Sequence, residues 1–158
     1  MKSFLASLWI LAGVIGVSTL GHANEAPEFT LSTTDGEQVS LSDYRGQPLM
    51  VHFWGSWCPA CKKVQPALQA IADENEADGL VLLGVNFAED EGVDPQAVLT
   101  ERGHSFTTLV RGMDVVKLYG VKGTPTTFFI DRDGQVVGIS NAYKPDDPEL
   151  REMAAKIL

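Results

Sequence analysis

The sequence is poor in cysteine, histidine and basic residues. Its 158 residues include two cysteines and three histidines, and 12 lysines and arginines stand against 21 aspartates and glutamates, for a formal charge of −9. Two cysteines exclude a disulfide-dense scaffold, a four-cysteine zinc site and a four-cysteine iron–sulfur cluster. The acidic balance argues against a nucleic-acid partner, because a phosphate backbone requires a basic face.

A long apolar run occurs only near the first residue. Lys2 precedes an apolar stretch of 17 residues, 4–20, and Gly21-His22-Ala23 places small residues at the two positions that a signal peptidase reads. We therefore predict an export signal over residues 1–23, cleaved after Ala23. The run is at the lower limit for spanning a bilayer, so an uncleaved membrane tether through residues 4–20 is the alternative. Both alternatives place residues 24–158 outside the cytoplasm, in the periplasm, where disulfides can form.

Residues 24–158 have the pattern of one α/β domain. The first two expected strands flank Asp35-Gly36, a pair typical of a hairpin turn. The strands are expected at 29–31, 38–41, 49–54, 80–87, 107–110, 126–130 and 135–140, and the helices at 59–77, 94–103, 113–119 and 147–158. Because strands alternate with helices, we predict a sheet with parallel members, covered on both faces.

The chemistry is concentrated in the segment Trp57-Cys58-Pro59-Ala60-Cys61. It follows an apolar strand and begins a helix, with Cys58 at the N-cap and Pro59 in the first turn. Unpaired N–H groups and the positive end of the helix dipole stabilise a thiolate there, which lowers the pKa of such a thiol. Cys61 lies one turn later and is expected to be more buried. We predict an exposed nucleophile, Cys58, beside a resolving thiol, Cys61.

Two other interpretations of this cysteine pair are a structural disulfide and a metal site. A structural disulfide closing a four-residue loop would stabilise the fold by only about 2 kcal/mol, against about 3 kcal/mol for a fifteen-residue loop. A metal site would need histidine ligands, but His104 follows Gly103 in an expected surface loop and His22 belongs to the export signal. No histidine stands at metal-finger spacing from the cysteines, so no metal is expected. A redox-active dithiol is favoured.

Two motifs resemble the thioredoxin-fold proteins of the TlpA/ResA/CcmG group, which are exported thiol–disulfide oxidoreductases. One is Phe-Trp-Gly-Ser-Trp-Cys-Pro-Ala-Cys at residues 53–61, with Pro66 five residues on. The other is Tyr-Gly-Val-Lys-Gly-Thr-Pro-Thr-Thr-Phe-Phe-Ile-Asp at residues 119–131. The resemblance covers nearly all of residues 27–158. It implies a thioredoxin fold, a central mixed sheet flanked by helices, with an N-terminal β-hairpin and an inserted segment at about 86–110.

The resemblance also implies roles for individual residues. Cys58 would be the nucleophile and Cys61 the resolving thiol. Pro125 would be a cis-proline beside the disulfide, and Thr124 would lend its backbone to an extended substrate peptide. Independently of the resemblance, the position of Trp57 directly before Cys58 predicts that it packs in an apolar rim that excludes water from the sulfurs.

The positions that handle protons depart from the related proteins. Cytoplasmic thioredoxins have a buried aspartate six residues before the first cysteine, where this chain has His52, and they pair it with a lysine that residues 80–87 lack. ResA-like members have a glutamate three residues after the second cysteine, where this chain has Val64. His52 is therefore a candidate proton acceptor for Cys61, since a neutral imidazole can act as a base. The alternative is a buried, hydrogen-bonded histidine that only packs.

We expect thiol–disulfide exchange on exported proteins, in the reductase direction that the resemblance implies. Apocytochrome c thiols would be a target, and a membrane dithiol would donate the electrons. The redox-active pair Cys58–Cys61 needs no dissociable cofactor. One alternative is a copper-binding module similar to the Sco group, although that group has three residues between its cysteines. The other is a peroxiredoxin-like peroxidase, although residues 54–57 lack the threonine that precedes a peroxidatic cysteine.

Overall fold

The computed structural model describes residues 24–158, so the predicted export signal lies outside the described residues. The strands are β1 (Thr30–Thr33), β2 (Gln38–Ser40), β3 (Leu49–Trp54), β4 (Val81–Asn86), β5 (Thr107–Val110), β6 (Thr126–Ile130) and β7 (Val136–Ser140). The α-helices are α1 (Pro59–Glu74), α2 (Pro95–Glu101), α3 (Met113–Leu118) and α4 (Pro148–Ala155), with short 3₁₀ turns η1 (Leu41–Tyr44) and η2 (Glu76–Asp78).

The strands form one mixed sheet in the order β2-β1-β5-β4-β3-β6-β7. Strands β3, β4 and β5 run parallel, whereas β6 and β7 add antiparallel on one side and β1 and β2 on the other. This is the predicted thioredoxin-fold α/β sheet, with its N-terminal hairpin joined to the segment that carries β5.

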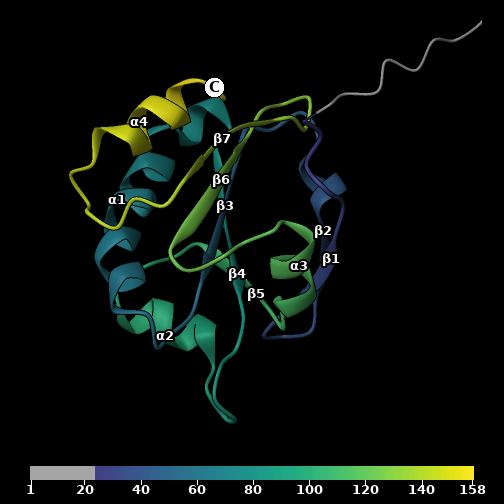
Figure 1. Ribbon diagram of the computed structural model, residues 1–158, viewed down its shortest axis with the longest axis vertical. Coiled ribbons are helices and arrows are strands. Elements are labelled where there is room, and N and C mark those ends of the chain that lie inside the picture. The colour runs from purple at the N-terminus through teal and green to yellow at the C-terminus, as the bar shows by residue number, and fades with distance from the viewer. Residues whose placement is uncertain (1–23) are drawn as a thin grey trace, which may run out of the picture.

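Helices cover both faces of the sheet (Figure 1). Helices α1 and α4 lie on one face, and Leu99 of α2 joins the same buried core. Helix α3 lies on the other face, where Phe29 and Val39 from the N-terminal segment join its core. The prediction of a sheet covered on both faces is therefore confirmed.

Strand β3 is the buried centre of the sheet, with all six residues buried. Successive side chains of a strand point to opposite faces. Met50 and Trp54 belong to the core under α1, so His52 between them faces α1 as well. Phe53 belongs to the core on the α3 side. Because β3 leads directly into α1, it fixes where Cys58 lies.

Most element boundaries differ from the prediction by a few residues, and two of the differences have a clear local cause. The second strand of the hairpin ends at Ser40, because Ser40 and Asp43 form a capping box that begins η1. Helix α1 ends at Glu74 rather than near residue 77, and η2 follows it and stops at Gly79 in the left-handed conformation, with φ 76°. The N-cap predicted for the next helix is confirmed, since the Asp94 side chain accepts the N–H groups of Gln96 and Ala97.

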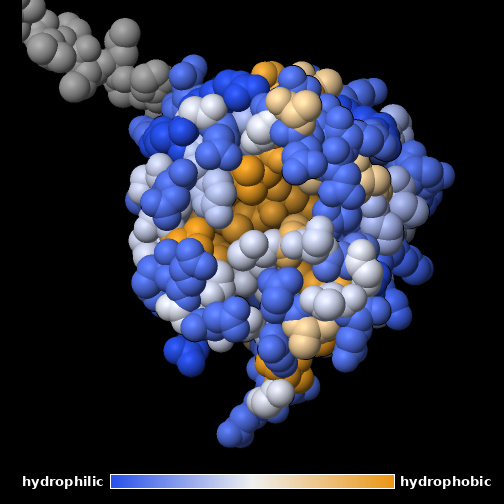
Figure 2. Space-filling model, turned by 180° about the vertical axis from the view of Figure 1, so that it is seen from behind, coloured by the Kyte–Doolittle hydropathy of each residue, from blue (hydrophilic) through white to orange (hydrophobic). Residues whose placement is uncertain are grey.

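The described chain begins at the end of the sheet opposite the start of α1, where Cys58 is the N-cap (Figure 1). The carbonyl of Asn24 accepts the N–H of Val136, and the N–H of Ala26 donates to Gly134, both beside the turn from β6 to β7. None of the helices within residues 24–158 has the length and apolarity needed to cross a membrane. Seen from behind, the surface is mostly hydrophilic around an apolar hollow, and the loop between β4 and α2 projects at the bottom (Figure 2).

Candidate active site

The two cysteines lie at the start of α1, joined by a disulfide. Cys58 is the N-cap of the helix, and its Sγ accepts the N–H of Cys61 at 3.0 Å. Pro59 follows in the first turn, where its missing N–H costs no hydrogen bond. The sulfur predicted to become a thiolate therefore already accepts a backbone N–H and faces the positive end of the helix dipole.

Cys58 is less exposed than the sequence predicted. In the disulfide form it is 3% exposed and Cys61 is fully buried, so the order is as expected but the nucleophile is not open to solvent. The cause is local, since the Cys58 sulfur is bonded to the buried Cys61 sulfur and turned toward the helix N–H groups. An incoming thiolate therefore has to approach the disulfide along the rim of the site. By the rim we mean the loop before β6 on one side and Trp57 with Phe87 on the other.

The loop before β6 forms one side of that rim. The Thr124–Pro125 peptide bond is cis, as predicted. A hollow of about 400 Å³ is lined by Ala60 between the cysteines, by residues 122–125, and by Asn141 and Tyr143. Asn141 Nδ2 donates to the Pro125 carbonyl at 3.2 Å and to Thr126 Oγ1 at 2.7 Å. Within residues 24–158, no backbone hydrogen bond engages the N–H or C=O of Thr124.

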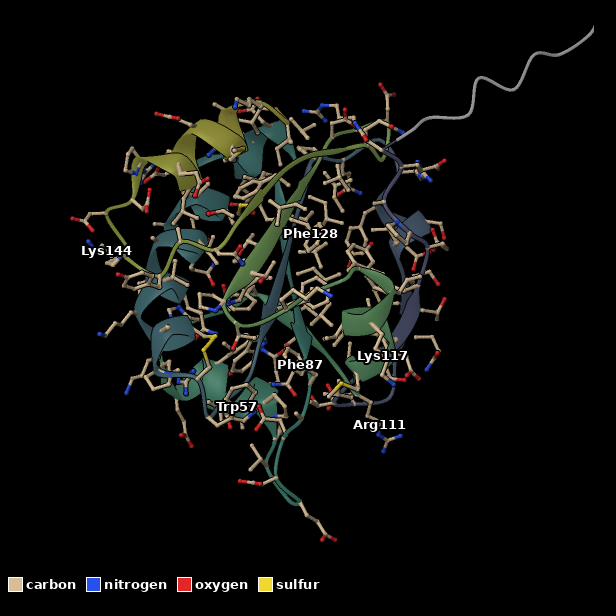
Figure 3. The ribbon with its side chains drawn as sticks, viewed as in Figure 1. Trp57, Phe87, Arg111, Lys117, Phe128 and Lys144 are labelled. Carbon is tan, nitrogen blue, oxygen red and sulfur yellow. A yellow bond between two sulfur atoms is a disulfide. The ribbon has the colours of Figure 1, made fainter. Side chains whose placement is uncertain are left out.

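Trp57 and Phe87 form the opposite, aromatic side of the rim (Figure 3). Trp57 is 50% exposed, and its ring meets that of Phe87 edge to face with 6.0 Å between centroids. A Cβ on Gly55 would lie 2.4 Å from the Trp57 ring, so the ring rests on that glycine. Beyond Phe87 a second hollow, of about 640 Å³, extends to Arg111. Trp54 is fully buried and donates from Nε1 to Thr108 Oγ1 at 2.9 Å.

His52 is fully buried in the layer between β3 and α1. Its Nδ1 is 3.0 Å from Thr127 Oγ1, and its Nε2 has no hydrogen-bond partner among the residues that the structure describes. Burial, and to a smaller extent the nearby His104, lower the pKa of His52 to about 3. The imidazole is therefore neutral at physiological pH.

His104 does not lie on a surface loop, contrary to the prediction. It is 8% exposed, and its ring centroid is 6.0 Å from that of Phe106. The cause is the end of α2, where the His104 N–H donates to the carbonyl of Leu99 and turns the ring inward. Burial and the charge of Arg102 lower the pKa of His104. No group of three or more potential metal-ligating side chains occurs within residues 24–158.

Sequence reasoning missed a polar cluster directly before the cysteines. Ser56 contacts Glu89, which follows β4, and Arg102, which ends α2. These partners are 33 and 46 residues away in the chain, so no local pattern links them to the motif. The one sequence signal for this cluster was a polar residue on the inward face of the predicted helix. That residue is Gln65, four residues after Cys61, and it is fully buried.

Comparisons with known proteins agree with this geometry. The model of the AhpC/TSA family matches residues 22–139. Thiol-disulfide oxidoreductase ResA of Bacillus subtilis is 30% identical over 125 residues, which cover 78% of this chain and 69% of the relative. A Chlorobium tepidum structure described as thiol:disulfide interchange protein DsbE has a TM-score of 0.74 and 33% identity, covering 84% of this chain and 94% of that one. A secreted Mycobacterium tuberculosis disulfide oxidoreductase homologous to DsbE has a TM-score of 0.69 and 26% identity, with 81% and 95% of the chains covered.

Proposed function

Because this chain belongs to the AhpC/TSA family and is a thiol–disulfide oxidoreductase, we propose that it reduces disulfides of exported proteins through Cys58 and Cys61. The observation that carries the proposal is the N-cap position of Cys58, with its sulfur accepting a helix N–H and bonded to Cys61. A thiolate at that point is stabilised before any substrate arrives.

The exchange takes place in two steps that balance electrons and protons. The Cys58 thiolate attacks one sulfur of a substrate disulfide, so that a mixed disulfide forms and the other substrate sulfur leaves as a thiolate. Cys61 then loses its proton and attacks the Cys58 sulfur, and the second substrate thiolate departs. The substrate gains two electrons, and the protein ends as the disulfide that the structure contains.

The rim of the site provides a place for the substrate segment around its cysteine. We assign the unpaired backbone of Thr124 to pairing with an extended peptide, and the Pro125 ring and Trp57 to the apolar walls beside the sulfurs. The hollow lined by Ala60 and residues 122–125 supports this assignment, since it opens between the cysteines and the cis-proline loop. Recognition through backbone atoms would leave most substrate side chains without a specific contact.

We assign to His52 the role of first proton acceptor for Cys61. Its support is a neutral imidazole in the layer under α1 that also contains Cys61, with an Nε2 atom to which no described residue is bonded. When Nδ1 donates to Thr127 Oγ1, Nε2 carries a lone pair. A pKa of about 3 makes the resting imidazole a weak base, so it would have to take up the Cys61 proton during the attack on the mixed disulfide.

The compartment and partners follow from the same proposal. The residue pattern at 1–23 and the secreted Mycobacterium tuberculosis neighbour support export to the periplasm, either as a soluble protein or on a membrane tether. A reductase there would receive electrons from a membrane dithiol and use no dissociable cofactor. Apocytochrome c thiols as a target rest on the resemblance to the TlpA/ResA/CcmG group at residues 53–61 and 119–131.

The experiment is capture of the substrate by the Cys61→Ser full-length protein expressed in a bacterial periplasm. Without the resolving thiol, the mixed disulfide at Cys58 should accumulate as reducible adducts with client proteins. The double variant Cys58→Ser/Cys61→Ser is the matched control and should form none. Adducts with cytochrome c precursors would support the target. Equal recovery from both variants, or no adduct at all, would contradict the proposed function.

A further inference from the structure

All three polar groups of Ser56 are bonded to side chains of the segment 86–110. The N–H and the hydroxyl of Ser56 both donate to the Glu89 carboxylate at 2.5 Å. Arg102 Nη2 donates to the Ser56 carbonyl at 2.9 Å. One negative and one positive charge therefore hold the residue that leads into the cysteines. We call Glu89 and Arg102 the charge clamp.

The positive half of the clamp is fixed on three sides. Besides its bond to Ser56, Arg102 donates from Nη1 to Gln65 Oε1 at 3.1 Å, and its guanidinium lies 5.8 Å from the centroid of the Trp54 ring. Gln65 and Trp54 are fully buried. Arg102 thus connects the loop before Cys58 to α1 and to the end of β3.

The negative half is held by Asn86 and by an unusual backbone turn. Asn86 Nδ2 donates to Glu89 Oε1 at 2.6 Å. The preceding residue, Ala88, has a φ of 54°, in the left-handed region that residues other than glycine rarely adopt. The unfavourable conformation of Ala88 occurs directly before Glu89, the residue whose carboxylate contacts Ser56.

Both charges contact a residue that lies close to the nucleophile in the chain. Cys58 is the second residue after Ser56, so their Cα atoms are at most about 7.6 Å apart. The residue that both charges contact therefore lies within one screening length of Cys58, which is about 8 Å at physiological salt. Burial lowers the pKa of Arg102 and the charge of Glu89 raises it, so the two charges act on each other as well. A guanidinium remains protonated at physiological pH.

We propose that the charge clamp positions Ser56 and, through its two opposing charges, sets the reduction potential of the Cys58–Cys61 pair. Glu89 and Arg102 are positioning residues, because they bond to Ser56 and not to the sulfurs, while their charges act on Cys58 through space. The proposal rests on the proposed function, since it concerns the same dithiol.

The direction of each effect follows from the half-reaction. The disulfide takes up two electrons and one proton to become the Cys58 thiolate and the Cys61 thiol, so reduction adds a negative charge at Cys58. Glu89 disfavours that charge and Arg102 favours it. Removing the charge of Glu89 should stabilise the reduced form, and removing the charge of Arg102 should stabilise the disulfide.

The test is the redox equilibrium of the full-length protein with glutathione, measured for Glu89→Gln and Arg102→Met. We expect Glu89→Gln to favour the reduced form by about three- to tenfold and Arg102→Met to favour the disulfide by a similar factor. A tenfold change corresponds to about 30 mV. The pH at which Cys58 becomes reactive toward iodoacetamide should fall in Glu89→Gln and rise in Arg102→Met.

Two further variants separate charge from packing. Glu91→Gln removes the same charge from an exposed position in the same loop and should leave the equilibrium constant within twofold of the unmodified protein. Arg102→Lys keeps the positive charge, so its equilibrium constant should also stay within twofold of the unmodified protein. If Arg102→Met fails to fold, Glu89→Gln and Arg102→Lys together test whether the charges set the potential. Any pattern other than opposite shifts in the stated directions overturns the clamp as a determinant of the potential.

The outcome is separable from that of the proposed function. If the unmodified protein reduces a protein disulfide while Glu89→Gln leaves its potential unchanged, only the clamp proposal fails. If the unmodified protein exchanges with no disulfide, the proposed function fails.

Discussion

Cys58 lies where a thiolate gains stabilisation from the backbone alone. Its sulfur accepts the Cys61 N–H, and Pro59 lets the helix begin without an unsatisfied donor at that position. These features follow from five consecutive residues, and this is why the sequence predicted them. The exposed fraction of Cys58 could not be predicted from these five residues, because it depends on the disulfide and on how the rim packs around the sulfur.

The burial of His52 predicts a pH dependence of stability. The folded-state pKa is about 3, against an ordinary value of 6.5, so between these pH values the unfolded chain binds a proton that the folded chain does not. The free energy of unfolding should therefore fall as the pH drops from 6.5 toward 3, by up to about 1.4 kcal/mol per pH unit. His52→Gln, followed by denaturant titration at several pH values, should show a shallower dependence.

The same variant tests His52 as the proton acceptor. In a single-turnover reaction, His52→Gln should slow the attack of Cys61 on the mixed disulfide by about 10²-fold or more, because a glutamine cannot accept a proton. Met50→Leu, two residues earlier on the same face, is the control for packing and should leave the rate unchanged. An unaltered rate and pH profile in His52→Gln would remove the residue from the mechanism.

At the scale of elements, β3, β4 and β5 carry a row of small and polar residues under α1. His52 pairs across the sheet with Thr127 on one side and with Gly84 on the other, and Gly84 pairs with Thr108. The glycine is required by space, since a Cβ there would lie 2.8 Å from Thr108 Oγ1 and 2.9 Å from Trp54 Nε1. The row thus leaves room for the hydrogen bond between Trp54 and Thr108 beneath the active site.

Gly84→Ala should therefore reduce the free energy of unfolding by about 1–3 kcal/mol, because the added methyl forces the Trp54 and Thr108 side chains apart. Gly123→Ala is the matched control, since a Cβ there meets no heavy atom within 4 Å, and it should change stability by less than about 0.5 kcal/mol. Chemical denaturation of both variants measures the difference. Equal stabilities would contradict this account of the row.

Most elements could be predicted because each has its own local signal. The apolar run of β3, the proline after Asp94 and the glycine turns of the hairpins act over a few residues. What the sequence could not predict depends on partners distant in the chain. The inward turn of His104 places its ring against Phe106, which belongs to a core built from elements far apart in the chain. The contact of Glu89 with Ser56 needs β4 beside β3.

At the scale of the whole molecule, the candidate site and the start of the described chain lie at opposite ends of the sheet (Figure 1). Asn24 pairs beside the turn from β6 to β7, whereas Cys58 follows the other end of β3. A tether before residue 24 would thus leave the rim around Trp57 and Pro125 facing away from its attachment point. Soluble and tethered forms of the protein would present the same site to a client.

The central claim is that the start of α1 stabilises a thiolate at Cys58. The most direct measurement is the rate at which iodoacetamide alkylates Cys58 in the Cys61→Ser protein between pH 4 and pH 10. The account predicts that the rate reaches half its maximum well below pH 8.5, the ordinary ionisation point of a cysteine. A half-maximal rate at or above that pH would contradict it.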